Sequence, residues 1–250
     1  MVADGDDTAR LQDIVYTVDE RIQTLVAYNL SVPERVASTL ADYFDGQSVT
    51  LRRGQTDSAL PKNFMVLHDG EQFVAASPVR AVYDAVRRQS DLVDETDPAG
   101  IEIPAVVENI DETAFTSYDK ARMIGASRRI ERHAWEEREG ELHAGFQRLS
   151  NARDQWRLYT RLASRVETHV YGAPDWSIPP TDIAVHTSDA VEITDTWFVV
   201  YDGDEEKKRA LLAEERGPGR FHGFWTDHPT VVDAVLDRLR AVYPSTPTTS

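Results

Sequence analysis

The chain has 250 residues, of which 41% are hydrophobic and 28% charged, and it contains no cysteine. This apolar share is enough for a buried core, and the lack of cysteine excludes disulfides, thiolate metal sites and cysteine nucleophiles. No apolar run reaches the roughly 18 residues needed to cross a bilayer, and the acidic N-terminus MVADGDD is unlike a signal peptide, so we expect a cytoplasmic protein.

Acidic residues outnumber basic ones by 43 to 27, which gives a formal net charge of −16. The basic residues are mostly arginine, because Lys62, Lys120, Lys207 and Lys208 are the only lysines. An acidic surface with little lysine is typical of proteins from a cytoplasm that holds molar salt, as in haloarchaea, since salt screens the self-repulsion. An ordinary acidic protein is the alternative. In both cases the charge disfavours sequence-independent DNA binding, which requires a basic surface.

In the first third of the chain, hydrophobic periodicity and turn residues predict alternating helices and strands. Ser31 is the expected N-cap of a helix that runs on from Pro33. An Asp-Gly turn at 69–70 joins the last two strands into a hairpin. The predicted elements are helices over 8–20, 33–44 and 78–88, and strands over 24–28, 48–53, 63–70 and 71–77.

The rest of the chain begins with an acidic connector over 90–104, which proline and glycine interrupt. Polar segments at 1–7 and 244–250 are expected to form flexible tails. The elements predicted after the connector are helices over 119–138 and 150–165, strands over 168–172, 183–187, 196–203, 209–215 and 220–225, and a helix over 229–243.

This order of elements predicts a mixed α/β (α+β) fold, in which a twisted mixed sheet is flanked by helices. Three sequence blocks of the first third recur in the same order in the last third. The recurrence favours two pseudo-repeated αβ halves with a ligand cleft between them, and chance similarity of acidic αβ segments is the alternative. The paired blocks are 25–33 with 169–180, 54–70 with 185–203, and 78–86 with 229–235. The predicted domains are an N-terminal αβ half over 8–90 and a second domain over 105–243, made of a helical lead-in (105–138) and an αβ half (139–243).

The predicted helix over 119–138 gathers positive charge on one face. Over 120–133 its formal charge is +4, in a protein of −16. Such a face would bind a phosphate or carboxylate ligand or dock an acidic partner, because arginine recognises these groups in a bidentate way. A solvated face whose arginines pair with the many carboxylates is the alternative. The residues of this face are Arg122, Arg129, Arg132 and His133, with Arg128 at its edge.

Aromatic residues near predicted strand ends form a second candidate site, since an indole or phenol can line a pocket for a planar ligand. Core packing is the alternative for each of them. Trp197 and Phe198 are adjacent on one strand, so they must face different layers. The candidates are Tyr171, Asp175, Trp176, Trp197 and Trp225.

The sequence contains none of the GxSxG, P-loop, GxGxxG, HExxH or EF-hand motifs. His133 and Glu137 are spaced for a shared metal on a helix, but no third ligand is indicated, and an ion pair explains Glu137 better. We therefore predict neither catalytic nor metal-binding residues, and the residues assign no cofactor.

Several segments of the second half resemble the DICT sensory domain, which occurs in diguanylate cyclases and two-component signalling proteins. The preceding segment 115–135 resembles the lead-in of haloarchaeal members, and 8–90 more loosely resembles the N-terminal part of stand-alone haloarchaeal versions. The segments that carry the resemblance, over about 110–240, are ELHAGFQRLS (141–150), YTRLASR (159–165), HVYGAPD (169–175), DTWFVVYDG (195–203), ALLAEER (210–216) and FHGFWTDHPTVVDAV (221–235).

The resemblance implies a non-enzymatic signal-input or adaptor module. The family supplies no settled ligand, and the chain has no room for a cyclase, kinase or receiver domain. We therefore expect a cytoplasmic sensory protein that binds a small ligand and signals through a partner protein that carries the output. A ligand-free interaction scaffold and a transcription-associated regulator are the alternatives.

Overall fold

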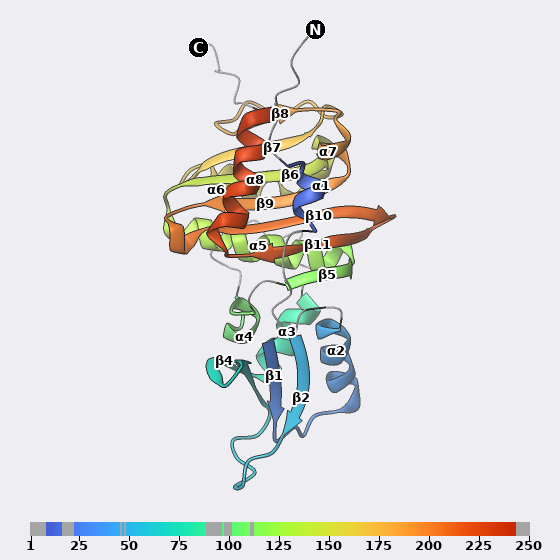
Figure 1. Ribbon diagram of the computed structural model, residues 1–250, viewed down its shortest axis with the longest axis vertical. Helices are drawn as coiled ribbons and strands as arrows, with labels where there is room; N and C mark the ends of the chain where they lie inside the picture. Colours follow the sequence, from blue (N-terminus) through green and yellow to red (C-terminus); the bar gives the residue numbers. More distant parts are fainter. Residues whose placement is uncertain are drawn as a thin grey trace.

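The structure is a computed structural model, and it describes residues 9–16, 23–45, 47, 49–88, 97, 102–110 and 113–243. The described strands form two mixed sheets, which lie at opposite ends of the molecule's long axis (Figure 1). The predicted mixed α/β fold class is confirmed. The expected tails and most of the expected connector over 90–104 lie outside the described residues.

The small sheet has the strand order β2-β1-β3-β4. β1 and β2 are parallel and flank helix α2 in the sequence, whereas β3 pairs antiparallel with β1 and β4. The hairpin of β3 and β4 turns at Gly70, whose φ of +59° glycine adopts without steric cost. The bounds are β1 Gln23–Tyr28, α2 Glu34–Phe44, β2 Val49–Gly54, β3 Phe64–Asp69, β4 Gln72–Pro78 and α3 Val79–Arg88.

The large sheet has the strand order β5-β11-β10-β9-β6-β7-β8. β6, β7 and β8 are parallel neighbours, and the other pairs are antiparallel. The bounds are β5 Thr113–Tyr118, β6 Glu141–Arg148, β7 Glu167–Ala173, β8 Ala184–Thr187, β9 Thr196–Asp202, β10 Arg209–Gly217 and β11 Arg220–Thr226.

Helices cover both faces of the large sheet. α5 packs on β9, β10 and β11 from one side, and α8 and α1 pack on the other side, while α4 lies against β3 and β4 between the two sheets (Figure 1). No helix within the described ranges has the length and apolar character needed to cross a membrane. The bounds are α1 Leu11–Ile14, α4 Ala105–Glu108, α5 Lys120–Glu137, α6 Trp156–Leu162, α7 Val191–Thr194 and α8 Pro229–Val242, with 3₁₀ helices η3 Leu149–Gln155 and η4 Glu205–Lys207.

Strand β9 serves both layers because successive side chains of a strand point to opposite faces. Trp197, Val199 and Tyr201 belong to the core on the α5 side, and Phe198 and Val200 belong to the core on the α8 side. All five side chains are buried. The expectation that Trp197 and Phe198 face different layers is therefore confirmed.

Arg122 of α5 connects the large-sheet unit to the small one. Its guanidinium donates hydrogen bonds to the backbone carbonyls of Asp42 and Asp45 at the C-terminal end of α2, where the helix dipole favours a cation. A second connection is the hydrogen bond from the N–H of Val106 to the hydroxyl of Ser77 (3.0 Å). One apolar cluster extends through both connections, so the two sheets share a core on this side.

The N-terminal helix differs from the expectation in both length and place. α1 is shorter than the predicted helix over 8–20, of which residues 8 and 17–20 lie outside the described residues. Its apolar side chains pack against α8 and β10, and the N–H of Leu11 donates to the Glu192 carboxylate (2.7 Å). The expected N-terminal half over 8–90 therefore includes a segment that packs on the large sheet, and the small-sheet unit starts at β1.

Other local predictions also need correction. The lead-in over 105–138 is not wholly helical, because it includes β5, whose partner β11 lies far along the sequence. Strand β6 was not predicted, and the predicted helix over 150–165 is η3 followed by the shorter α6. Pro33, not Ser31, occupies the N-cap of α2, and the backbone N–H of Ser31 donates to the side chain of Asn63.

Part of the large sheet has the same strand order and strand directions as the small sheet, which bears on the predicted repeat of two αβ halves. The order β2-β1-β3-β4 has the same relative strand directions as β7-β6-β9-β10 in the large sheet. In this correspondence β3 matches β9, as the sequence blocks indicate, but β1 matches β6 and not β7. The duplication itself stays a prediction.

A buried ion pair fixes α5 against α6. Arg128 and Glu131 are both 0% exposed and form an ion pair, and the Arg128 guanidinium also donates to the side chain of Gln155 (3.0 Å). The hydroxyl of Tyr159 donates to the second oxygen of Glu131. Since burial without a partner is costly for a charge, both members depend on this network.

We expect the substitution Glu131→Gln to lower the free energy of unfolding by about 3–5 kcal/mol, because it leaves the Arg128 charge buried without its carboxylate. Chemical denaturation in a fixed KCl concentration measures the change. The control is Glu136→Gln, which removes the solvent-exposed partner of Arg132 and should cost less than about 1 kcal/mol. Equal losses in the two variants would contradict the role of the buried pair.

Candidate ligand site

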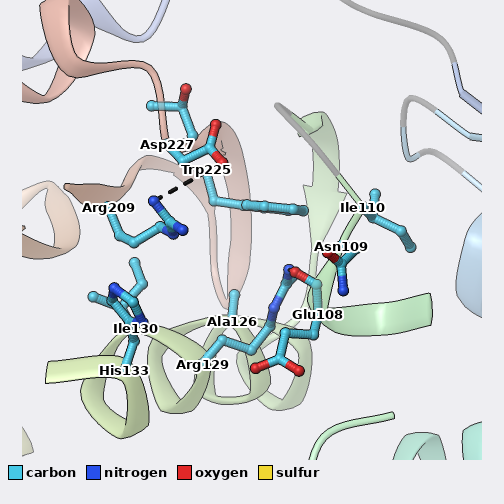
Figure 2. Close-up of a pocket in the computed structure, with 11 residues that line it drawn as sticks. Glu108, Asn109, Ile110, Ala126, Arg129, Ile130, His133, Arg209, Trp225 and Asp227 are labelled. Carbon is cyan, nitrogen blue, oxygen red and sulfur yellow. Dashed lines mark hydrogen bonds and ion pairs between the residues drawn. The ribbon is translucent and has the colours of Figure 1, made fainter. Parts of the chain in front are cut away.

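A cavity of about 380 Å³ lies between α5, the end of α4 and the ends of β10 and β11 (Figure 2). It has the size of a small-molecule site. Charged, polar and aromatic groups converge on it from these separate elements. The lining residues are Glu108, Asn109, Ile110, Ala126, Arg129, Ile130, His133, Arg209, Trp225, Thr226 and Asp227.

Arg129 and Trp225 form one wall of the cavity. The Arg129 guanidinium lies over the indole ring, 3.9 Å from its centroid, and donates a hydrogen bond to the backbone carbonyl of Glu108 (2.6 Å). Burial lowers the pKa of Arg129 from its usual value, although arginine stays charged at neutral pH. The Arg129 guanidinium is therefore a cation held in a fixed position beside the cavity. The groups that hold it are the Trp225 ring and the Glu108 carbonyl, and neither carries a formal charge.

Arg209 supplies a second guanidinium from the start of β10. Its Nη1 donates to the backbone carbonyls of Lys208 (2.7 Å) and Glu206 (3.3 Å). The carboxylate of Asp227 is 3.9 Å away, which is beyond hydrogen-bond distance. Within the described part of the chain, Arg209 forms no other ion pair.

His133 lies on α5, one turn after Arg129. Its Nε2 donates to the backbone carbonyl of Lys207 (3.0 Å), and its ring meets the ring of Tyr201 edge to face. Burial and, to a smaller extent, the positive charge of Arg209 lower the pKa of His133. At neutral pH the imidazole is therefore neutral.

Three arginines of the predicted face do not reach the cavity. Arg122 contacts the end of α2, Arg128 is fully buried in its ion pair, and Arg132 pairs with Glu136 (2.9 Å) on the helix surface. The five basic residues therefore do not converge on this cavity, and Arg128 and Arg132 pair with carboxylates, as the alternative interpretation of this face has it. Arg129 and His133 alone of that set line the cavity, because small differences of angle around the helix direct these side chains to different neighbours.

Of the predicted aromatic cluster, only Trp225 lines the cavity. Trp197 is in the core, where its Nε1 donates to the hydroxyl of Ser127 (3.1 Å). Trp176 packs edge to face on the ring of Trp156. Core packing, the alternative for each of these residues, explains the buried Trp197 and the partly buried Trp176, which packs against the same core.

Asp175 and Tyr171 are also placed elsewhere. The carboxylate of Asp175 accepts hydrogen bonds from the hydroxyl (2.6 Å) and backbone N–H (2.8 Å) of Ser150, and these bonds lower its pKa. Tyr171 is buried on the α8 side of the large sheet, where its hydroxyl bonds to Nδ1 of His143 (2.9 Å). Neither residue contacts the cavity.

Arg209 and a group of buried histidines are functional candidates that the sequence alone did not indicate. Arg209 begins a strand that was predicted, but its approach to α5 depends on tertiary packing. His143, His169 and His186 are nearly or fully buried on three neighbouring strands. An available signal was the shared Glu-x-His pattern of 141–143 and 167–169, which places both residues of each pair on one strand face.

Comparison with known protein families finds one family whose model matches the central part of the chain. Residues 105–216 match the model of the DICT family, described as "Sensory domain in DIguanylate Cyclases and Two-component system". This segment is therefore a DICT sensory domain, as its resemblance indicated. The matched range starts at α4 and ends within β10, so β11 and α8 lie beyond it.

Other comparisons add no functional argument. No curated protein matches the chain. The crystal structure of polyphosphate kinase from Porphyromonas gingivalis is similar at 12% sequence identity and a TM-score of 0.36. The match covers 96% of this chain and 50% of the kinase chain, so the present chain spans about half of that protein. A likeness this weak establishes neither a common fold nor a common activity.

The lowered pKa of His133 predicts a pH dependence of stability. In the unfolded chain this histidine takes up a proton near pH 6.5, whereas the folded cavity resists protonation. We expect the free energy of unfolding to fall as the pH falls through 6.5, and to fall less steeply in His133→Gln. Chemical denaturation at several pH values between 8 and 5 measures both slopes. Identical slopes would mean that the folded structure does not disfavour the charged imidazole.

Proposed function

We propose that this chain is a non-enzymatic sensory protein whose DICT domain binds a small anionic ligand in the cavity between α5 and β11. The sensory character of the DICT domain supports the function class. The ligand class is supported by the charge arrangement of the cavity. The proposed protein passes its ligand-bound state to a partner protein that carries the output.

The observation that carries this proposal is the pair of guanidinium groups of Arg129 and Arg209. The lining also includes the carboxylates of Glu108 and Asp227, so its formal charges balance. However, Arg129 bonds to the carbonyl of Glu108, and Arg209 lies 3.9 Å from the Asp227 carboxylate. A phosphate or carboxylate between the guanidiniums would accept the charge-assisted hydrogen bonds that these carboxylates do not accept.

Trp225 adds a preference for a ligand with a planar part. Its indole is 9% exposed, and Arg129 fixes the orientation of the ring by stacking on it. An aromatic ring held in this way offers an apolar surface beside the two cations. The cavity therefore favours a small planar anion over a simple inorganic ion.

Helix α5 offers a route from the cavity to the rest of the molecule. Arg129 and His133 line the cavity, and Arg122 on the same helix bonds to the end of α2 in the small-sheet unit. A ligand that shifts α5 would therefore act on the contact with α2. This supports the small-sheet unit as the surface that a partner protein recognises.

The proposal includes the source of the protein and the compartment in which it acts. The acidic, lysine-poor composition supports a haloarchaeal source and a cytoplasm with molar salt. The net charge of −16 supports a protein partner over direct DNA binding.

Native mass spectrometry and an absorption spectrum of protein purified in molar KCl test the proposal. We expect a small molecule to co-purify with the wild type and to be lost from the double variant Arg129→Gln/Arg209→Gln. Arg132→Gln is the matched control, because it removes an arginine of the same helix that lies outside the cavity. The control should retain the ligand.

Two outcomes would contradict the proposal. A wild-type mass equal to that of the bare chain, with no binding of added nucleotides or phosphorylated metabolites, would favour a ligand-free scaffold. Retention of the ligand by the folded double variant would place the site elsewhere. Thermal unfolding of each variant establishes that it is folded.

A further inference from the structure

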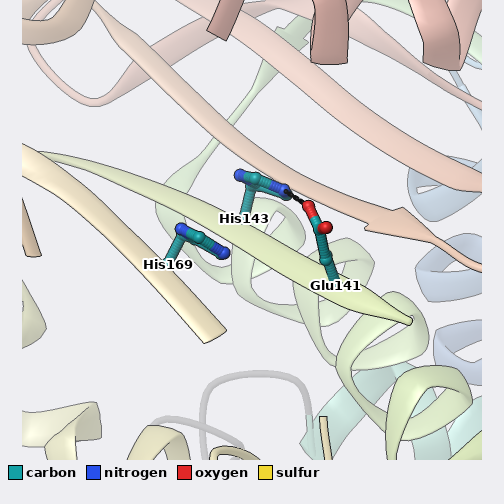
Figure 3. Close-up of side chains that lie close together, drawn as sticks. All are labelled: Glu141, His143 and His169. Carbon is teal, nitrogen blue, oxygen red and sulfur yellow. Dashed lines mark hydrogen bonds and ion pairs between the residues drawn. The ribbon is translucent and has the colours of Figure 1, made fainter. Parts of the chain in front are cut away.

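A second cluster of polar side chains lies on the opposite face of the large sheet from the cavity. His143 on β6 and His169 on β7 are direct cross-strand neighbours in a parallel pair, so their side chains share one face. Glu141 precedes His143 by two residues and therefore lies on the same face (Figure 3). The two histidines are 1% and 4% exposed.

Each of the two imidazoles is held by a hydrogen bond at its Nδ1 atom, so the Nε2 atom of each ring can bind a further partner. Their rings stack with centroids 4.4 Å apart and planes 9° apart, so they form no hydrogen bond to each other. Nδ1 of His143 bonds to the hydroxyl of Tyr171 (2.9 Å), and Nδ1 of His169 bonds to Nε2 of His186 (3.1 Å). Both Nε2 atoms remain for other partners.

Nε2 of His169 is a buried polar atom with no hydrogen-bond partner among the described residues. The carboxylate of Glu167 comes within 3.4 Å of it without hydrogen-bond geometry. A buried polar group that lacks a partner costs about 1–3 kcal/mol, so such an atom calls for an explanation. A bound cation would supply the missing partner.

One ligand atom each of Glu141, His143 and His169 lie within 4.8 Å of one another. Neighbouring ligands of a tetrahedral zinc ion are about 3.4 Å apart, given metal–ligand distances of about 2.0–2.2 Å. The separation of 3.2 Å between the Glu141 carboxylate and Nε2 of His143 already fits this value. The other separations are at most 4.8 Å, so these ligand atoms would need to approach by at most about 1.4 Å to reach the tetrahedral spacing. The Glu141 side chain, which is 35% exposed, can contribute to this movement.

The surroundings also match those of a metal site. A histidine that binds a metal through one nitrogen usually bonds through the other to a fixed partner, as both histidines do here. Arg240 donates to Oε2 of Glu141 (2.8 Å) and to Asp202 (2.6 Å), and within the described ranges no residue donates to Oε1 of Glu141. The carboxylates of Glu141, Glu167 and Asp202 outnumber the guanidinium of Arg240, although Lys208 also pairs with Asp202.

A metal-free explanation accounts for only part of the cluster. If Nε2 of His143 donates to Glu141 and the Tyr171 hydroxyl donates to Nδ1, then His143 is satisfied without an ion. That arrangement still leaves Nε2 of His169 without a hydrogen bond among the described residues, because its contact of 3.4 Å with the Glu167 carboxylate is an ion pair only when the imidazole is protonated. Two imidazoles and a carboxylate are a common ligand set for zinc and related divalent ions.

We propose that Glu141, His143 and His169 bind a divalent transition-metal ion of the zinc type. Three protein ligands leave a fourth position, which water or Glu167 would fill. The site is independent of the proposed anion cavity, because it uses β6 and β7 and lies on the other face of the sheet. It would fix the parallel strands β6 and β7 to each other or make the sensory domain responsive to metal.

The test is a titration of the full chain with ZnCl₂ after treatment with a chelator and dialysis into metal-free KCl buffer. Calorimetry should show about one Zn²⁺ per chain, and the ion should raise the melting temperature because it binds the folded state. Co²⁺ should give a visible absorption band, and Mg²⁺ should give neither effect, since it prefers oxygen ligands.

The variants His169→Gln and Glu141→Gln should weaken Zn²⁺ binding by at least about tenfold. This is the loss of metal affinity expected when a metal ligand, or a residue that hydrogen-bonds to one, is replaced. His222→Gln is the matched control, because it removes a histidine from β11 of the same sheet and should bind as the wild type does. Arg129→Gln should also bind Zn²⁺ normally, which separates this site from the cavity.

Absence of saturable Zn²⁺ binding by the wild type would overturn the proposal, as would normal binding by His169→Gln. If His169→Gln does not fold, Glu141→Gln decides, because its partly exposed side chain tolerates the change. Normal Zn²⁺ affinity and the normal rise in melting temperature in Glu141→Gln would then exclude the proposed ligand set.

Discussion

The structure depends on the burial of the large sheet on both faces. Strand β9 is near its centre, and its side chains alternate between two cores, with Trp197 toward α5 and Phe198 toward α8. Gly145 of β6 makes room for the Phe198 ring of the neighbouring strand, because a Cβ at Gly145 would lie 2.2 Å from that ring. The α5 layer continues into the small sheet and contains the cavity, whereas the α8 side holds the histidine cluster. The two proposed sites are therefore separated by the sheet.

Helix α5 illustrates how two adjacent residues of one type acquire different roles. Arg128 is fully buried and neutralised by Glu131, and this pair contributes to the fixed position of the helix. Arg129, the next residue, turns by about 100° around the axis and reaches the cavity wall at Trp225. The rigid pair thus supports the neighbouring cation that is available to a ligand. A fixed cation loses less freedom on binding than a flexible surface arginine does.

The elements that were predicted well are those whose signal is local. The helix α5 has an N-cap at Asp119, whose side chain accepts a hydrogen bond from the N–H of Arg122, and its apolar spacing is helical. The hairpin at Gly70 was likewise visible as an Asp-Gly turn. Strand β6 was missed because residues 142–146 are buried without interruption, so the strand has no alternating pattern. β5 was missed because it is stabilised by pairing with β11, which is distant in the sequence.

The residues alone were sufficient to indicate the mixed fold class, the DICT resemblance and a helix rich in arginine, because these depend on composition, local periodicity and short motifs. They also placed Arg129, His133 and Trp225 among the candidates. Only the tertiary structure separated these three from the seven other candidates, and it added Arg209. It also brought His143 opposite His169, which requires the register of two parallel strands joined by a long crossover. Local periodicity determines the face on which a side chain lies, whereas its neighbours across strands and helices are set by contacts between distant parts of the chain.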